Sequence, residues 1–209
     1  AVIDNEATKT SHTTQTLLES VIYNRYGWTQ FYDDMGNPDD NGSFFQQVAS
    51  DGSFTGIIPW DNRIVALKER YHHEIQGSYP SNFTLSTVSR YGTIAHRSAQ
   101  EVNSKLYYVC PTGVLVYGGG LESDTSRKLN EIYSGAVAGT DGIRYYLCLN
   151  NGGSTKKLYV YNTLLDVWTE EDPLDVVDFC QHSGKLYAMC ADGKVIIMND
   201  SSSTESVDW

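Results

Sequence analysis

The stretch KLYYVC at 105–110 is the clearest copy of a pattern that recurs through the chain. Altered copies follow as RYYLC at 144–148 and KLYAMC at 185–190, and RIVAL precedes them at 63–67. The basic residue that opens each copy returns after steps of 42, 39 and 41 residues. The sequence therefore predicts a structural repeat of about 41 residues.

Turn signals surround each copy of the pattern. Asp141-Gly142 precedes one copy, and Asn151-Gly152 and Asp192-Gly193 follow two of them. Asn-Gly and Asp-Gly between apolar runs indicate β-hairpins, because the tight turns of hairpins need residues with positive φ. With outer segments such as 83–90 and 167–172, each repeat is expected to hold four strands.

Four strands about every 41 residues indicate an all-β fold, β-propeller-like, with about four to five four-stranded blades. We expect one domain over 1–209. It divides into five approximate repeat units, 1–56, 57–92, 93–134, 135–172 and 173–209. The first unit is degenerate, with a candidate strand region at 21–32 and a short helix within 11–22. Both ends read as cut, so we expect a fragment of a longer chain and a ring with further blades. A meander sandwich with similar hairpins is the alternative.

Composition and residue spacing disfavour nucleic-acid binding, a membrane span and a zinc site. The formal net charge is −11, which disfavours tight nucleic-acid binding because phosphate is repelled. No apolar run of 18 residues is present, so no membrane span is expected. Cysteines stand in or beside apolar stretches without Cys-x-x-Cys spacing, which predicts buried free thiols and no zinc site at Cys110, Cys148, Cys180 and Cys190.

Two segments hold metal-type side chains. In His72-His73-Glu74, alternate residues of a strand point to opposite faces, so at most two ligands lie together and zinc is disfavoured. The segment 33–43 holds four aspartates, but their spacing does not match a calcium-binding EF-hand loop. We expect 72–74 to form a strand at a blade edge or interface, and 33–43 to form a solvated turn. A calcium site in 33–43 stays an open alternative.

Paired carboxylates are the requirement for glycoside hydrolysis, and Glu170, Glu171, Asp172, Asp175 and Asp178 are the candidates. They lie at a polar strand end, and no nucleophile elbow, phosphate loop or dinucleotide fingerprint is present. We therefore expect no enzyme, with no catalytic, cofactor-binding or metal-binding residues and no cofactor.

The segments 57–120 and 135–195, about 125 of the 209 residues, resemble propeller-bearing structural proteins of tailed bacteriophages. The resemblance is to the tail-hub or "stabilisation protein" group. It rests on the run from IIPWDNRIVALK through LSTVSRYGTIAHRS, and on YVYNTLLDVWTEED, which is also kelch-like.

The resemblance implies a non-catalytic virion structural protein of the tail hub or head-tail junction, assembled in the bacterial host cytoplasm. Its partners are then other virion proteins, with a homo-oligomeric ring expected, and it acts as a rigid protein–protein assembly module. The alternative is a carbohydrate- or receptor-binding propeller, in which Trp28 or Trp60 stacks on sugars. A propeller glycosidase is the least favoured reading.

Overall fold

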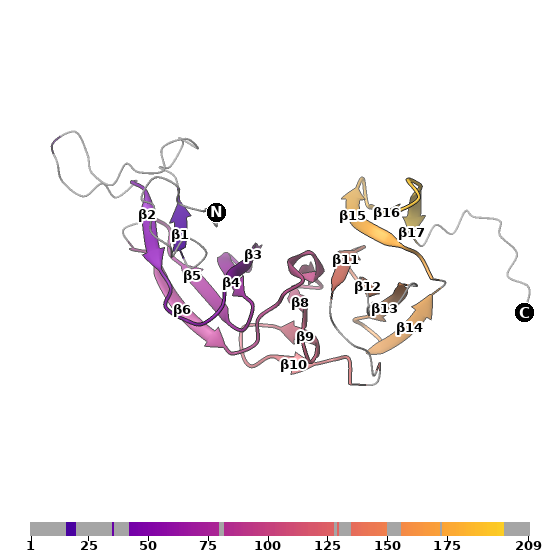
Figure 1. The fold of residues 1–209 in the computed structure, drawn as a ribbon, viewed down its shortest axis with the longest axis horizontal. Helices are drawn as coiled ribbons and strands as arrows, with labels where there is room; N and C mark the ends of the chain where they lie inside the picture. Colours follow the sequence, from indigo (N-terminus) through magenta and orange to yellow (C-terminus); the bar gives the residue numbers. More distant parts are fainter. Residues whose placement is uncertain are drawn as a thin grey trace, which may run out of the picture. The chain divides into compact units, whose positions relative to one another are not determined.

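The computed structural model describes residues 16–19, 35, 42–79, 82–127, 129, 135–149, 156–171 and 173–198. The chain divides into two compact units, 1–96 and 97–209. Nearly all regular structure in the described residues is antiparallel β-sheet (Figure 1), and η3 (His96–Ser98) is a single 3-10 turn. In that part of the chain, no helix has the length and apolar character needed to cross a membrane.

The first unit contains a two-stranded pair and a four-stranded sheet. The pair joins β1 (Thr16–Glu19) to β2 (Phe44–Gln47). The sheet has the order of the sequence: β3 (Phe54–Trp60), β4 (Arg63–Lys68), β5 (His72–Gln76) and β6 (Thr84–Ser89). The helix expected within 11–22 is wrong for residues 16–19, because their backbone groups pair with β2. The other residues of 11–22 and the candidate strand region 21–32 lie outside the described residues.

The second unit contains three sheets, again with strands in sequence order. The first joins β7 (Gln100–Val102), β8 (Lys105–Cys110), β9 (Gly113–Tyr117) and β10 (Ser123–Asp124). The next joins β11 (Ala136–Thr140), β12 (Arg144–Leu149), β13 (Lys157–Asn162) and β14 (Val167–Glu171). The last joins β15 (Val176–His182), β16 (Lys185–Cys190) and β17 (Val195–Met198).

The repeated apolar copies form the second strand of each sheet, β4, β8, β12 and β16. In β4, β8 and β12 consecutive residues are buried, so both faces of these strands are covered, which is why these copies are strongly apolar. The segments 83–90 and 167–172 supply the fourth strands β6 and β14, as expected. The all-β class and the sheets of three to four antiparallel strands are thus confirmed, whereas closure into a ring stays a prediction.

The hairpins before three of these second strands share one backbone form. Both central residues have positive φ at Asp61-Asn62 (43° and 58°), Asn103-Ser104 (49° and 61°) and Ser183-Gly184 (49° and 76°). Two successive residues with positive φ define the type I′ turn, whose twist matches that of the strands it joins. Asn, Asp and Gly adopt this conformation most readily, so the polar turns of the sequence have a direct structural cause.

The sheets of the second unit pack through alternate faces of their strands. Tyr145, Leu147 and Leu149 of β12 pack against the β7–β10 sheet, in a cluster with Tyr107 and Val109. The residues between them face the β15–β17 sheet, where Tyr146 packs with Leu186 and Cys148 with Ala188. This alternation lets one sheet serve two interfaces.

The first strands of the three sheets lie next to one another, with β11 beside both β7 and β15. Gly139 of β11 allows close approach, since a Cβ there would come within 2.6 Å of Phe179 on β15. First strands grouped together, with successive strands leading outward, are the arrangement of neighbouring propeller blades.

Candidate functional site

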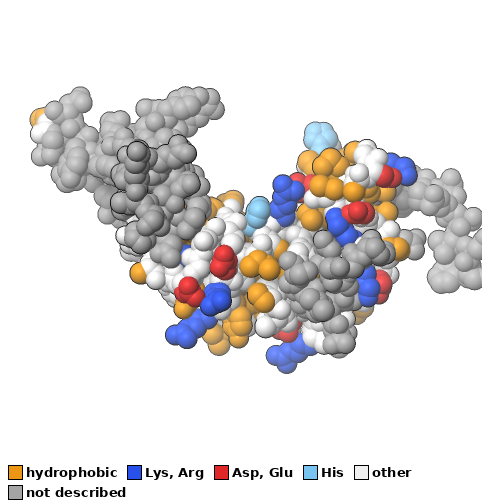
Figure 2. All heavy atoms as spheres, viewed as in Figure 1, with side chains coloured by type: hydrophobic (Ala, Val, Ile, Leu, Met, Phe, Trp, Pro, Cys, Tyr) orange, Lys and Arg blue, Asp and Glu red, His pale blue; other side chains and the backbone are white. Residues whose placement is uncertain are grey.

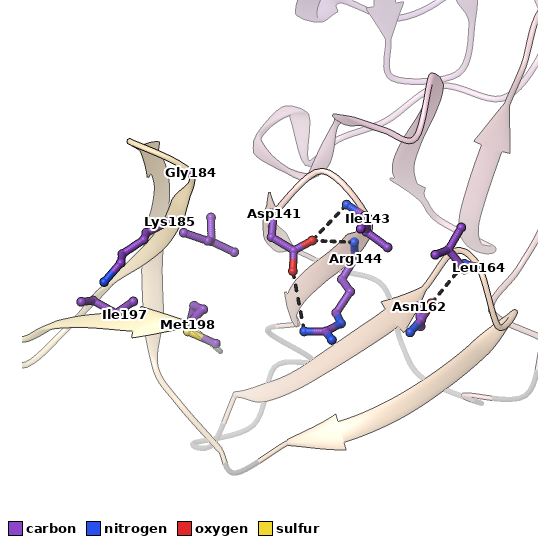
Figure 3. Close-up of a pocket in the computed structure, with 10 residues that line it drawn as sticks. Asp141, Ile143, Arg144, Asn162, Leu164, Gly184, Lys185, Ile197 and Met198 are labelled. Atoms are coloured by element: carbon purple, nitrogen blue, oxygen red, sulfur yellow. Dashed lines mark hydrogen bonds and ion pairs between the residues drawn. The ribbon is translucent and has the colours of Figure 1, made fainter. Parts of the chain in front are cut away.

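A cavity of about 540 Å³ lies where the β12–β13 strand ends face the β16–β17 sheet (Figure 3). The residues that line it come from hairpin turns and strand ends of two separate repeats. The wall combines charged and apolar residues, namely Asp141, Ile143, Arg144, Asn162, Leu164, Gly184, Lys185, Leu186, Ile197 and Met198.

Asp141 fixes one side of this cavity. One carboxylate oxygen, Oδ1, accepts hydrogen bonds from the backbone N–H groups of Ile143 (3.0 Å) and Arg144 (2.7 Å). The other, Oδ2, accepts one from the Tyr146 hydroxyl at 3.1 Å and lies 3.7 Å from Arg144 Nη1. The hydrogen bond between Arg144 and Tyr146 raises the pKa of the guanidinium, so Arg144 stays charged. The turn is therefore held rigidly by its own acid, which leaves that acid little capacity for a ligand.

The β13–β14 turn is held in a similar way. Asn162 Oδ1 accepts hydrogen bonds from the N–H groups of Leu164 (3.0 Å) and Leu165 (3.2 Å). Thr163 donates its hydroxyl to the Ile143 carbonyl at 2.7 Å, which joins the two turns.

Three apolar side chains of these joined turns face solvent. Ile143, Leu164 and Leu165 are 48%, 67% and 70% exposed. Figure 2 shows further hydrophobic side chains exposed over β15–β17, interspersed with charged ones. Apolar side chains on rigid turns beside a cavity are typical of a binding surface. We call the exposed side chains Ile143, Leu164 and Leu165 the hairpin-end patch.

The first unit holds a second candidate, a buried polar cluster around Lys68 and His73. Both side chains are 0% exposed. Lys68 Nζ donates to the Val48 carbonyl (3.1 Å), to the Ser50 carbonyl and to the Ser50 hydroxyl (3.2 Å). His73 Nε2 lies 2.8 Å from Ser50 Oγ, and Nδ1 lies 3.1 Å from Thr87 Oγ1.

The geometry explains what this cluster does. Desolvation, and then the charge of Lys68, lowers the pKa of His73 to about 4, so its ring is neutral at pH 7. Desolvation also lowers the pKa of Lys68. Ser50 and His73 resemble a nucleophile and its base, but a group with a pKa near 4 is a weak base at neutral pH. The cluster therefore anchors the 48–50 segment to the sheet.

The His72-His73-Glu74 segment forms β5 and is buried throughout. His73 contacts Ser50 and Thr87, whereas Glu74 accepts a hydrogen bond from Arg63 at 3.0 Å. Across the described ranges, no group of three or more His, Cys, Asp or Glu side chains is placed to hold a metal ion. Of the 33–43 segment, only residues 35, 42 and 43 are described, so its four aspartates stay outside the structural account.

The carboxylates considered for glycoside hydrolysis are spread over several places. Glu170 and Glu171 are successive residues of β14 and point to opposite faces. Asp175 pairs with Lys156, and Asp178 lies 3.5 Å from Arg97. Asp172 lies outside the described residues.

Two expectations about single residues are wrong. Trp60, proposed for sugar stacking, is 4% exposed, because it packs at the buried end of β3. Cys180 is exposed, because the second half of β15 faces outward, whereas Cys110, Cys148 and Cys190 are buried free thiols as expected. Trp28 lies outside the described residues.

Sequence reasoning missed both the cavity and the Lys68–His73 cluster. The sequence marks Asp141 only as a turn residue, although Asp-Gly-x-Arg at 141–144 places a carboxylate near the arginine that opens the next strand. No comparable signal connects Ser50, Lys68 and Thr87, because they come from separate strands and loops.

Comparison with protein families gives no matching family model, and comparison with curated proteins gives no match either. Solved structures do resemble the chain. Kluyveromyces lactis Hsv2, in a structure described by its complete loop 6CD, aligns at a TM-score of 0.52 with 15% identity. The alignment covers 86% of this chain and 57% of the Hsv2 chain, so this chain spans little more than half of that protein. At this identity the similarity concerns the fold alone.

Two weaker similarities have TM-scores below 0.5. The computationally designed Ika4 protein aligns at 0.45 with 12% identity, over 71% of this chain and 92% of that chain. A luciferin-regenerating enzyme aligns at 0.28 with 13% identity, over 92% of this chain and 84% of that chain.

Proposed function

We propose that this chain is a rigid protein–protein assembly module whose sheets are blades of a β-propeller. The observation that carries the proposal is the hairpin-end patch, where Ile143, Leu164 and Leu165 stand exposed on turns fixed by Asp141 and Asn162. Such a surface is already ordered before it meets a partner, so binding costs little conformational entropy.

The interior supports the same function. Buried titratable side chains are used in internal contacts: Lys68 holds the 48–50 backbone, His73 contacts Ser50 and Thr87, and Glu74 pairs with Arg63. These contacts stiffen the sheets. A stiff scaffold with apolar turns suits docking, and it offers a partner a fixed shape to match.

The biological setting belongs to the same proposal. The resemblance of 57–120 and 135–195 to phage tail-hub proteins is what supports proposing a virion setting, with other virion proteins as partners and a homo-oligomeric ring as the assembly. A net charge of −11 fits a wall past which DNA moves without binding.

The test compares particles assembled with the natural chain and with the double variant Leu164→Asp and Leu165→Asp. We expect the natural chain to be a stoichiometric component of purified particles by mass spectrometry, and the variant to be depleted at least about tenfold, which corresponds to about 1.4 kcal/mol. Leu121→Asp is the matched control, because Leu121 is 93% exposed on another connection of the same unit. Normal incorporation of the double variant, or a natural chain found only outside particles, would overturn the proposal.

A further inference from the structure

The cavity of about 540 Å³ contains two polar side chains that stand side by side on neighbouring strands. Arg144 of β12 and Asn162 of β13 are directly opposite residues in the antiparallel register. Directly opposite residues point to the same face of a sheet, with Cβ atoms about 4.5–5.5 Å apart. Figure 3 shows the Arg144 guanidinium between the side chains of Asn162 and Met198 in this view. We call Arg144 and Asn162 the donor pair.

Both members of the donor pair retain unused hydrogen-bond donors. Asn162 Oδ1 accepts two backbone N–H groups of its own turn, which fixes the orientation of the amide. Arg144 makes its contacts through Nη1, at 3.5 Å from the Tyr146 hydroxyl and 3.7 Å from Asp141 Oδ2. Within the described part of the chain, Nδ2 of Asn162 and both Nε and Nη2 of Arg144 have no hydrogen-bond partner. The contacts that exist therefore hold both side chains in place while leaving N–H groups for a ligand.

The chemistry of these donors matches a carboxylate. A guanidinium binds the two oxygens of a carboxylate through two parallel N–H groups, and an amide beside it adds a further donor. Among the described residues that line the cavity, Arg144 and Lys185 are cationic and Asp141 is acidic. This surplus of one positive charge favours a ligand with one negative charge.

The remaining wall suits an organic ligand. Leu186, Ile197 and Met198 supply apolar surface beside the donor pair. Met198 and the donor pair also line a second cavity of about 490 Å³, whose walls include Val160 and Val167. Sites for small organic molecules are typically clefts of roughly 300–1,000 Å³, mostly apolar, with a few placed polar groups. The donor pair therefore stands between two spaces of suitable size and lining.

We propose that Arg144 and Asn162 bind the carboxylate of a small organic acid whose apolar body lies against the apolar wall of the cavity. Asp141, and Glu171 in the second cavity, oppose a second negative charge, so a monocarboxylate is favoured over a dicarboxylate. This binding site goes beyond the assembly function. It depends on the donor pair, whereas assembly is tested at Leu164 and Leu165, so either proposal can fail without the other.

The direct test is a fluorine NMR titration of the full chain with two probes of similar shape. 4-(4-Fluorophenyl)butanoate carries a carboxylate, and 4-(4-fluorophenyl)butan-1-ol carries a neutral hydroxyl in its place. We expect the acid to bind with a Kd of about 1 mM or below, and at least about tenfold more tightly than the alcohol. Absence of binding by the acid, or equal affinity for both probes, overturns the proposal.

Substitutions then locate the carboxylate. Asn162→Asp retains the oxygen that caps the turn but replaces the amide N–H groups by a negative charge, so it should weaken binding of the acid at least about tenfold and leave the alcohol unaffected. Arg144→Gln should act in the same direction. Asn82→Asp is the matched control, because Asn82 Oδ1 also accepts two backbone N–H groups, both at 2.9 Å, but in the first unit. Unchanged affinity of Asn162→Asp for the acid, an equal loss for the alcohol, or an equal loss in Asn82→Asp would each contradict a carboxylate at the donor pair.

Discussion

Lowering the pH should destabilise the first unit through His73. The neutral ring is 0% exposed and lies between Ser50 and Thr87, with Lys68 nearby. Desolvation is the larger cause of its lowered pKa, and the charges of Lys68 and His72 add to it. Protonation would place a second buried cation next to Lys68, which the fold opposes.

The magnitude follows from the pKa of about 4 in the folded protein against 6.5 in the unfolded chain. At about 1.36 kcal/mol per unit, this difference sets an upper value of about 3.4 kcal/mol. Solvent near the half-buried Ser50 screens part of it, so we expect about 2 kcal/mol. Because the folded pKa is below the unfolded one, the stabilisation is complete above pH 6.5 and is lost as the pH falls from 6.5 towards 4.

The assay is urea unfolding of the natural chain and of His73→Gln at pH 7.5 and pH 4.5. Gln retains a donor and an acceptor but does not titrate, so the difference between the two chains isolates His73 from the carboxylates that titrate over the same range. The natural chain should lose about 2 kcal/mol more than the variant between the two pH values. An equal loss in both chains would refute the assignment of the pH dependence to His73.

Two further predictions concern the second unit. Tyr145→Phe removes a hydroxyl that donates a hydrogen bond to the Ser98 carbonyl at 2.7 Å in a fully buried site. The free energy of unfolding should therefore fall by about 1–2 kcal/mol. An unchanged urea midpoint would contradict this prediction. Native protein should expose one thiol to a disulfide reagent, at Cys180, and all four after denaturation, since burial raises the pKa of Cys148 and Cys190. Cys180→Ser should then show no native reaction, and any remaining one would place the reactive thiol elsewhere.

Local sequence signals predicted the sheets because each signal acts within a few residues. Asp61-Asn62 and Ser183-Gly184 specify type I′ turns by their own tolerance of positive φ. An apolar run between two such turns then becomes a central strand. The expected helix within 11–22 failed at 16–19 because pairing with β2 comes from a segment more than twenty residues away.

The functional features depend on contacts that sequence spacing does not encode. The Lys68–His73 cluster joins a loop, two inner strands and the fourth strand of one sheet. Trp60 and Cys180 each lie in apolar stretches, yet one is buried and the other exposed, because the packing of neighbouring sheets decides which face of a strand meets solvent. The cavity at the hairpin ends likewise needs two repeats side by side.

The recurring basic residue links the repeat to the proposed function. Arg63 lies 3.0 Å from Glu74 and 3.6 Å from Asp61, and Arg144 lies 3.7 Å from Asp141, so in two repeats this charge is used to hold the local turn or strand. Lys185 has the same position in the last sheet, forms no ion pair with a described residue and lines the cavity beside the hairpin-end patch. In a chain of net charge −11, an available cation beside exposed leucines favours a partner surface that is apolar and locally acidic. The repeat thus fixes where Lys185 stands, and we infer that this lysine, without an ion pair to a described residue, can meet an acidic group of such a partner.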